Sequence, residues 1–515
     1  MSALFQVIVG VALLVFLFGL PLRPVAWGGP SGAGPFEEGR ESRAGRWSRD
    51  VRLPLARFAE FRSPDQPLAA TAETLAGFHA LLAAARFGVL WFVLRRLGGR
   101  GALAAIGVAA AALPLAFAAP RQDEADVGLL LFVIVVAVTT GSPVRRWALV
   151  ALPALFAFWA NAHASAVVGL AWLAVLTAGR AVEWWRSAPD GETNRRAVGR
   201  LVLALGLCAA AACLNPDGPR LFADAFRATK NPNIASLPDW QPIDFNKPAG
   251  MPWAYFTTLA VLFVAQLLAP RVLGPGPMFI LLTFGFWPLV QQRGSAYWFL
   301  IAPCLTVPLV ASALANLTAS RPEATDAEPT PRWRWVAAGV LVVSLLTTPA
   351  MRWLVTGRPR SIEDVVEADT PWRVALELTA ERDEAGRFLP QLRTITQTSY
   401  PGGRYRGAIL CGDAQGDFLA WVLDEDNTRP VMTYTRPEAL GQPHWAETHR
   451  ALEGHGDWWE ILGRHQVNLV AIDPGQWLKL ADRLRTSPDW LVVQDDGPGG
   501  ILAAVRRLPK LPIEP

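Results

Sequence analysis

Carboxylates gather in a polar stretch that follows the first apolar segment of the chain. Glu37 and Glu38 lie side by side in PFEEGR, and Asp50 follows twelve residues later. A carboxylate on such a loop can act as the general base that takes a proton from a hydroxyl group. The same acids could instead pair weakly with neighbouring arginines on a solvated loop. Residue types alone leave both interpretations open, with Asp65 as a later alternative base.

A second acidic group stands immediately before another apolar run. The stretch RQDEADVG holds Arg121, Asp123, Glu124 and Asp126. One interpretation is a site for a phosphate and a metal ion, and the other is a set of carboxylates that cap the next helix and face its dipole. The four cysteines show no CxxC or Cys/His spacing. A divalent metal is therefore supported by no ligand motif, and the sequence identifies no cofactor.

Asn161 and His163 interrupt one of the most apolar parts of the chain, FAFWANAHASAVVG. An unpaired polar group there would cost several kcal/mol in a lipid environment. The plainer interpretation is a turn, because Asn tolerates turn geometry and His can bond a backbone carbonyl. The alternative is that both side chains shape a ligand pocket.

Cations and one further acid occur in the later polar stretches. Arg220 follows the turn sequence NPDG, Asp239 precedes Trp240 in PDWQP, and Arg293 stands in the short connection QQRGS. Arginines at such positions either contact lipid headgroups or hold a phosphate through charge-assisted hydrogen bonds. Arg293 is the most specific signal among them, because the connection in which it stands is so short.

The elements that position these residues are apolar runs. The chain has 515 residues, of which 52% are hydrophobic and 18% charged, and this balance indicates a polytopic membrane protein. A net charge of +4, without a basic stripe, excludes nucleic acid as a partner. About eleven spans are predicted, near 3–22, 74–97, 102–119, 127–142, 146–160, 163–180, 199–213, 252–269, 275–292, 296–316 and 333–350.

Charge patterning predicts the orientation of these spans. Short basic connections such as PVRRW and PRWRW face the cytoplasm if the N-terminus lies inside. The prediction is a multi-pass protein of the cytoplasmic (inner) membrane, with a transmembrane domain over 1–350. The opposite side then receives the first outer loop 23–73, residues 120–126, the Asn161/His163 turn, the outer loop 214–251, residues 291–295 and everything after 351.

The region 361–515 has the composition of a small extracytoplasmic α/β domain. Strands are predicted at 407–412, 429–434, 467–473, 490–496 and 500–507, and helices at 370–389, 415–423, 443–465 and 475–486. This alternation predicts a mainly parallel sheet. No nucleotide-binding or hydrolase motif is present, so Asp413, Asp417 and the histidines 444, 449, 455 and 465 are interpreted as caps and helix-surface residues.

Several separated stretches resemble bacterial polytopic proteins of the GT-C glycosyltransferase type, in a largely uncharacterised branch related to lipid-phosphate-sugar-dependent transferases. FWANAHASAVVGL is similar to the family's Trp-Ala-Asn-x-His turn, and LNPDGPRLF to its Asn-Pro-x-Gly exit. PDWQP stands where relatives have Glu-Trp-x-Pro. GDFLAWVL, DWWEILGRHQVNLVAID and SPDWLVVQDD resemble motifs of the family's terminal domain.

The resemblance implies a GT-C-like fold with its active site on the outer face and a polyprenyl-phosphate sugar donor. It also implies an acidic catalytic residue in the first outer loop, for which Glu37, Glu38 and Asp50 are the candidates. The expected partners are a lipid-linked sugar donor and membrane lipids, with no acceptor identified. The expected substrate-binding residues are Arg121, Asp123, Glu124, Asn161, His163, Arg220, Asp239 and Arg293.

Two other functions remain open. Relatives often place an Asp directly after the first span, where this chain reads PLRPVAWGG. That departure motivates a catalytically silent GT-C-fold protein that serves as an envelope scaffold or binding protein. A secondary transporter is less favoured, because the apolar runs show no inverted repeat.

Overall fold

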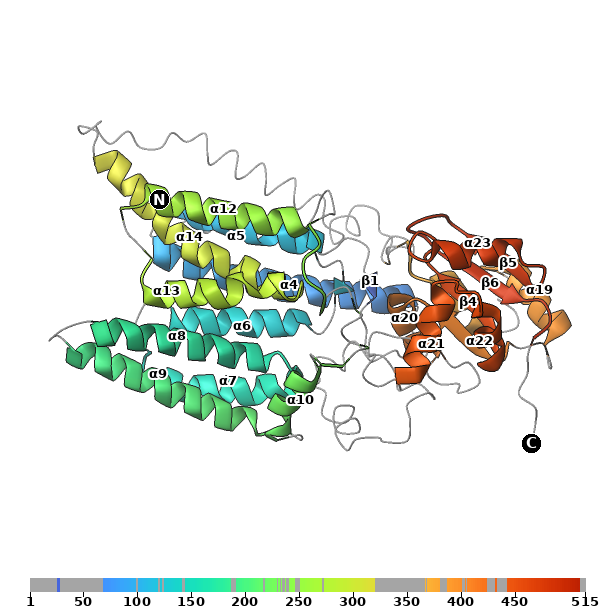
Figure 1. Ribbon diagram of the computed structural model, residues 1–515, viewed down its shortest axis with the longest axis horizontal. Coiled ribbons are helices and arrows are strands. Elements are labelled where there is room, and N and C mark those ends of the chain that lie inside the picture. Colours follow the sequence, from blue (N-terminus) through green and yellow to red (C-terminus); the bar gives the residue numbers. More distant parts are fainter. Residues whose placement is uncertain are drawn as a thin grey trace.

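The computed structural model describes the strand at 26–27 and most of 68–319 and 366–509 (Figure 1). Glu37, Glu38 and Asp50 lie outside the described residues, as do Asp123, Glu124, Asp239 and the predicted spans 3–22 and 333–350. Within the two large segments the gaps are 99–100, 119–120, 123–124, 141–143, 187–190, 216–217, 229, 232, 234–236, 238–239, 246–250, 271–272, 367, 380–386, 401–402, 404, 424–430 and 433–441.

The first of the two large segments is a bundle of helices. Each predicted apolar run between 74 and 316 coincides with one helix or, at 275–292, with a series of short helical pieces. The elements are α4 (Leu68–Gly98), α5 (Gly101–Ala118), α6 (Ala125–Thr139), α7 (Ala148–Ala162), α8 (Ala166–Arg186), α9 (Gly191–Ala212), α10 (Arg220–Ala228), α12 (Met251–Leu268), α13 (Pro275–Ile280), η2 (Leu281–Gly285), η3 (Trp287–Leu289) and α14 (Gly294–Ala319).

The bundle is apolar on its surface as well as in its core. Fully buried Phe132, Trp159 and Trp298 contribute to one continuous hydrophobic cluster. Large apolar side chains such as Val150, 74% exposed, and Leu267, 68% exposed, point away from that cluster. Water would penalise an apolar surface of this extent, whereas lipid accepts it. The bundle is therefore membrane-embedded.

Two of these helices combine the length and the hydropathy of a membrane span. Among the described residues, Ala166–Arg186 and Gly294–Leu317 are long and apolar enough to cross a bilayer, and five further apolar helices are shorter. The total of about eleven spans thus stays a prediction.

The second unit has three layers, with helices on both faces of a four-stranded sheet. Ile409 and Leu469 face one helical layer, while their neighbours Leu410 and Val470 face the other, so both faces of the strands are buried. One layer contains α18 (Trp372–Thr379), α19 (Pro390–Ser399) and α20 (Asp413–Leu423), and the other contains α21 (Gln442–Leu452), α22 (Trp458–Arg464) and α23 (Leu478–Thr486).

The sheet differs from the mainly parallel prediction. Its order is β3-β4-β6-β5, with β3 (Ala408–Cys411) parallel to β4 (Val467–Ile472). Strand β6 (Leu502–Arg506) runs antiparallel to both β4 and β5 (Trp490–Asp495). The connection DGPGG explains the reversal, because Gly497 and Gly499 both adopt positive φ and close a hairpin.

The long helix predicted at 443–465 is also two helices. Gly454 has a φ of +66°, a left-handed conformation that ends α21 before α22 begins.

A small sheet lies between the bundle and the α/β unit. Strand β1 (Ala26–Trp27) pairs in parallel with β2 (Arg121–Gln122), which immediately precedes α6. Strand β1 also contacts α20 of the terminal unit (Figure 1). The start of α6 therefore lies at the end of the bundle that faces the α/β unit.

Candidate functional site

The turn between α7 and α8 holds His163 in a defined orientation. His163 ends α7 with an extended backbone, and its N–H donates to the carbonyl of Trp159 at 2.8 Å. The backbone N–H of Ser165 donates to His163 Nδ1 at 3.0 Å, so Nδ1 is an acceptor. The Ser165 hydroxyl also lies 2.6 Å from Nδ1 and accepts from Trp159 Nε1 at 3.0 Å. These donors assign the proton of a neutral His163 ring to Nε2.

Helix α6 packs directly against this turn. A Cβ atom placed on Gly128 would lie 2.3 Å from Ser165 Oγ and 3.2 Å from His163 Nδ1. Only a residue without a side chain permits so close an approach. The start of α6 and the His163 turn thus form one packed unit.

The same end of α6 carries a buried ion pair. Arg86 on α4 donates through Nη1 to Asp126 Oδ1 at 2.6 Å, with side chains that are 7% and 19% exposed. Within the described part of the chain, Arg86 Nε is buried without a hydrogen-bond partner. Charges withdrawn into an apolar bundle are expensive, and in membrane proteins they are a default indication of function.

Asn161 forms a structural clamp. Its Nδ2 donates to the carbonyls of Ala157 at 2.7 Å and Leu214 at 2.9 Å, which ties α7 to the exit of α9. Asn215, next in the chain, closes the following turn through the carbonyls of Ala212 and Gly218. These hydrogen bonds therefore support the turn interpretation of Asn161.

Arg293 lies on the turn between η3 and α14, with its guanidinium 4.4 Å from the ring centroid of Trp240. Two backbone bonds fasten the segment around Trp240 to this turn: Gln292 N–H donates to Gln241 at 2.7 Å, and Ile243 N–H donates to Pro288 at 3.4 Å. A cation–π contact leaves the hydrogen-bond donors in the guanidinium plane directed sideways. Arg293 can therefore hold an anion while it remains stacked.

An aromatic cluster lies beneath the polar residues. Phe132 on α6 contacts Trp172, Phe284 and Tyr297 with centroid distances of 5.1 to 5.9 Å. Tyr297 in turn stacks on Trp287 of η3 at 5.3 Å. Rings packed from five elements form a rigid base, which fixes the start of α6 relative to the η3–α14 turn.

The remaining predicted site residues have less definite surroundings. Arg220 begins α10 and is exposed, while Phe222 of the same helix packs against the bundle core. Only the backbone of Arg121 is described, on β2. The structure thus brings His163 together with the start of α6 and places Arg293 beside Trp240.

Arg86 and Ser165 were not predicted from the sequence as site residues. Arg86 interrupts the apolar run AAARFGVL, and an ionisable residue inside a predicted span is a signal that could have been used. Asp126 belongs to the acidic stretch already noted, but its burial could not be read from the sequence. Ser165 follows His163 by two residues, a spacing that is common in ordinary turns.

No protein-family model and no curated protein sequence matches the chain. Among solved structures, the oligosaccharyltransferase AglB from Archaeoglobus fulgidus, in complex with an inhibitory peptide and a dolichol-phosphate, is similar over 92% of this chain and 66% of that one, with 10% identity and a TM-score of 0.46. ArnT from Cupriavidus metallidurans, bound to undecaprenyl phosphate, is similar over 98% of both chains, with 16% identity and a TM-score of 0.43.

This chain spans just under two thirds of the length of that oligosaccharyltransferase. Identities of 10–16% and TM-scores below 0.5 assign no activity to this chain.

Proposed function

We propose that this chain is an inverting, GT-C-like membrane glycosyltransferase that moves a sugar from a polyprenyl-phosphate donor to an acceptor outside the cytoplasm. The observation that carries the proposal is the buried Arg86–Asp126 pair at the end of the bundle where α6 meets the His163 turn. An apolar bundle gains little stability from such a pair, so a functional role accounts for its presence better.

The proposed reaction requires a base on one side of the sugar and cations on the other. A carboxylate of Glu37, Glu38 or Asp50 takes the proton of the acceptor hydroxyl as its oxygen attacks C1 of the sugar. The bond between C1 and the phosphate oxygen breaks, and the electron pair leaves with the phosphate. Arg121, Arg220 and Arg293 are proposed to stabilise that leaving group through charge-assisted hydrogen bonds.

Other residues have supporting roles in this proposal. Asp123 and Glu124 provide a second acidic pair, and Asp239 stands beside Trp240, on which Arg293 stacks. Asn161 and His163 shape the donor pocket, with the Nε2–H of His163 as a fixed donor. Arg86 and Asp126 are positioning residues that hold the start of α6.

Transfer from a panel of radiolabelled polyprenyl-phosphate sugars, with the protein in lipid nanodiscs, tests the proposal. The wild-type protein should turn over at least one donor, and the triple variant Glu37→Ala/Glu38→Ala/Asp50→Ala should not. Asp482→Asn, on an exposed carboxylate of the terminal unit, should leave turnover unchanged. Unchanged transfer by the triple variant would remove the first outer loop as the source of the base.

A double variant can separate the role of the ion pair in sugar transfer from its effect on stability. Asp126→Asn leaves Arg86 charged and buried, which should cost about 3–5 kcal/mol of stability. Arg86→Met/Asp126→Leu removes both charges and should restore much of that stability while transfer stays low. If the double variant transfers sugar at the wild-type rate, the pair is structural only.

A silent scaffold is the second candidate, and one observation favours it. The Asn161 amide donates to the backbone carbonyls of Ala157 and Leu214, and His163 Nδ1 bonds to Ser165, so the contacts described for both residues lie within the bundle. A protein that binds the donor without turnover in the nanodisc experiment would fit this function.

A further inference from the structure

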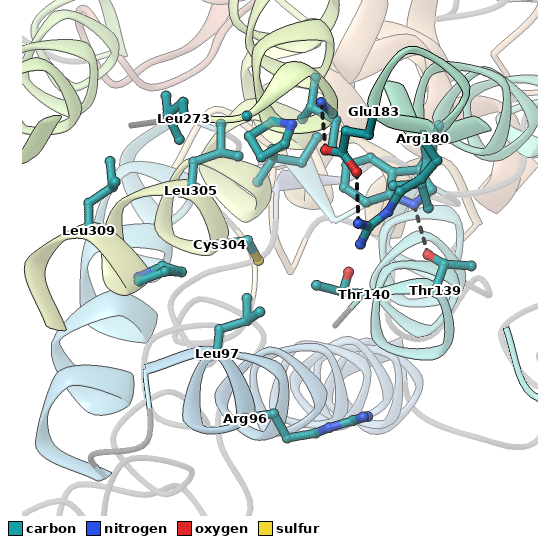
Figure 2. A pocket seen from close by; sticks show the side chains of 18 residues that line it. Arg96, Leu97, Thr139, Thr140, Arg180, Glu183, Leu273, Cys304, Leu305 and Leu309 are labelled. Atoms are coloured by element: carbon teal, nitrogen blue, oxygen red, sulfur yellow. Dashed lines mark hydrogen bonds and ion pairs between the residues drawn. The ribbon is translucent and has the colours of Figure 1, made fainter. Parts of the chain in front are cut away.

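The bundle contains a cavity of about 460 Å³ that is separate from the polar cluster near His163. Segments of α4, α6, α8, α14 and the start of α13 line it. Figure 2 shows Arg180 and Glu183 on one side and Leu97 and Arg96 across from them. Liquid water occupies about 30 Å³ per molecule, so the space is large enough for a lipid chain rather than a single solvent molecule.

The cavity lies toward the opposite ends of the same helices. Arg180 is fourteen residues beyond Ala166, where α8 leaves the His163 turn. At 1.5 Å per residue, that spacing places it about 21 Å along the helix. Thr140 is likewise fourteen residues beyond Asp126 and follows the last residue of α6. The charge pattern of the sequence predicts that this end faces the cytoplasm.

The polar side of the cavity is built around Glu183. Its Oε2 accepts from Arg180 Nη1 at 2.9 Å, and its Oε1 accepts from the backbone N–H of Gly276 at 3.3 Å. Helices α8 and α13 touch there so closely that a Cβ on Gly179 would lie 2.4 Å from Gly276 Cα. Among the described residues, the Arg180 guanidinium is thus held by one side-chain hydrogen bond, and its other donors can bind a ligand.

Two further polar groups lie on the lining. Arg96 is exposed at the end of α4, so Arg96, Arg180 and Glu183 together give this part of the cavity a net positive charge. In the part of the chain that the structure describes, the Thr140 hydroxyl is buried and forms no hydrogen bond. Neighbouring Thr139 differs, because it donates to Val135 O and accepts from Trp172 Nε1.

Most of the remaining lining is apolar. Leu176, Ile280 and Leu305 contribute walls deeper in the bundle, away from the end of α8. Just beyond Arg180 on α8, Trp185 is 82% exposed, as expected for an aromatic ring at the level of lipid headgroups. Arg180 therefore lies near the boundary between headgroups and chains, with the apolar part of the cavity beneath it.

We propose that this cavity binds one anionic phospholipid, with the phosphate at Arg180 and Arg96 and one acyl chain along Leu176, Ile280 and Leu305. Basic pockets between helices at the cytoplasmic surface are suited to anionic headgroups. The aliphatic walls select a lipid over free phosphate, and the two arginines select an anionic lipid over a zwitterionic one. Binding at this site does not depend on sugar transfer.

Native mass spectrometry of the full-length protein in mild detergent tests the site, with phosphatidylglycerol, chain-matched phosphatidylcholine and inorganic phosphate as probes. The wild-type protein should retain one phosphatidylglycerol in preference to phosphatidylcholine, and phosphate should not displace it. Arg180→Gln should weaken retention about tenfold or more. Arg180→Lys should preserve part of it, and the exposed Arg145→Gln should have no effect.

Leu176→Trp provides an independent test, because the larger side chain fills the part of the cavity proposed for the acyl chain and leaves both arginines in place. Its expected result is loss of the bound lipid, and Arg96→Gln provides a second charge variant if Arg180→Gln does not fold. Equal retention of phosphatidylcholine and phosphatidylglycerol would overturn the charge assignment. Displacement by inorganic phosphate, or unchanged retention in Leu176→Trp, would overturn the lipid site.

Discussion

Two histidines of this chain are held through different ring atoms. His163 receives donors at Nδ1 and keeps its proton on Nε2. His444, at the start of α21, uses Nε2 to donate to the carbonyl of Met432 at 3.0 Å. Its ring meets that of His465 edge-on at 5.1 Å, and His465 in turn contacts Glu447 at 2.8 Å. The titratable ring of His444 is thus part of the packing of the terminal unit.

Burial lowers the pKa of His444, and the nearby His465 lowers it further, while the Met432 carbonyl and Glu447 oppose the shift. The unfolded chain, with a His pKa of about 6.5, therefore binds the proton more readily than the folded state. The stability contributed by neutral His444 is complete above that value and is lost as the pH falls toward the lowered folded pKa.

The stability of the terminal unit should consequently decrease between about pH 7 and pH 5, and His444→Gln should flatten this decrease. Hydrogen exchange of α21 and α22 at pH 7.5 and 5.5 measures the effect. His455→Gln is the matched control, because His455 is exposed and pairs only with surface Glu453 in the described structure. An equal pH response in wild type and His444→Gln would contradict the assignment.

At the scale of elements, the packing of α6 on the α7–α8 turn depends on one missing side chain. Gly128→Ala would push a Cβ to within 2.3 Å of Ser165 Oγ and displace the partner of His163. Overpacking of this kind should cost about 1–3 kcal/mol. Gly199→Ala on α9 meets nothing within 4 Å and should stabilise its helix by about 0.5–1 kcal/mol.

Unfolding of both glycine variants in detergent, followed by tryptophan fluorescence, measures the difference. Loss of sugar transfer in Gly128→Ala with Gly199→Ala unaffected would link the turn to activity. Equal stability of the two variants would mean that the turn yields to the added methyl group at no cost.

Much of the helical architecture could be predicted, because apolar runs and basic connections respond to the same lipid environment that fixes the helices. The sheet was harder, since strands buried on both faces look alike whether they run parallel or antiparallel. The prediction of a single helix across 443–465 was wrong, because the left-handed backbone conformation of Gly454 interrupts an otherwise helical pattern.

The candidate site was predictable only in part. Asn161, His163 and Arg293 were identified as unusual polar residues, and the structure gives each of them specific partners. The pairing of Arg86 with Asp126 joins residues forty positions apart, and sequence spacing alone cannot indicate such a contact. The predicted base residues lie outside the described part of the chain, so their roles stay predictions.

For the whole molecule, the orientation across the membrane can be tested directly. Lys479 is exposed on the terminal unit, and Arg145 is exposed in the connection before α7. Intact cells should allow a membrane-impermeant maleimide to label Lys479→Cys, while Arg145→Cys should react only after permeabilisation. The parent protein provides the background, because three of its four cysteines are buried. Labelling of both variants in intact cells would contradict the predicted topology.

The contact of β1 with both β2 and α20 has a consequence for biosynthesis. A two-residue strand pair is too short to persist alone, so β1 depends on its neighbours for its position. The ribosome completes β1 and β2 long before α20 emerges. At about 5–20 residues per second, the roughly 300 residues from β2 to the end of α20 take about 15–60 s, and for that period the junction lacks its last component. A chaperone that covers this junction during synthesis would therefore act on the membrane-inserted helices before the terminal unit exists.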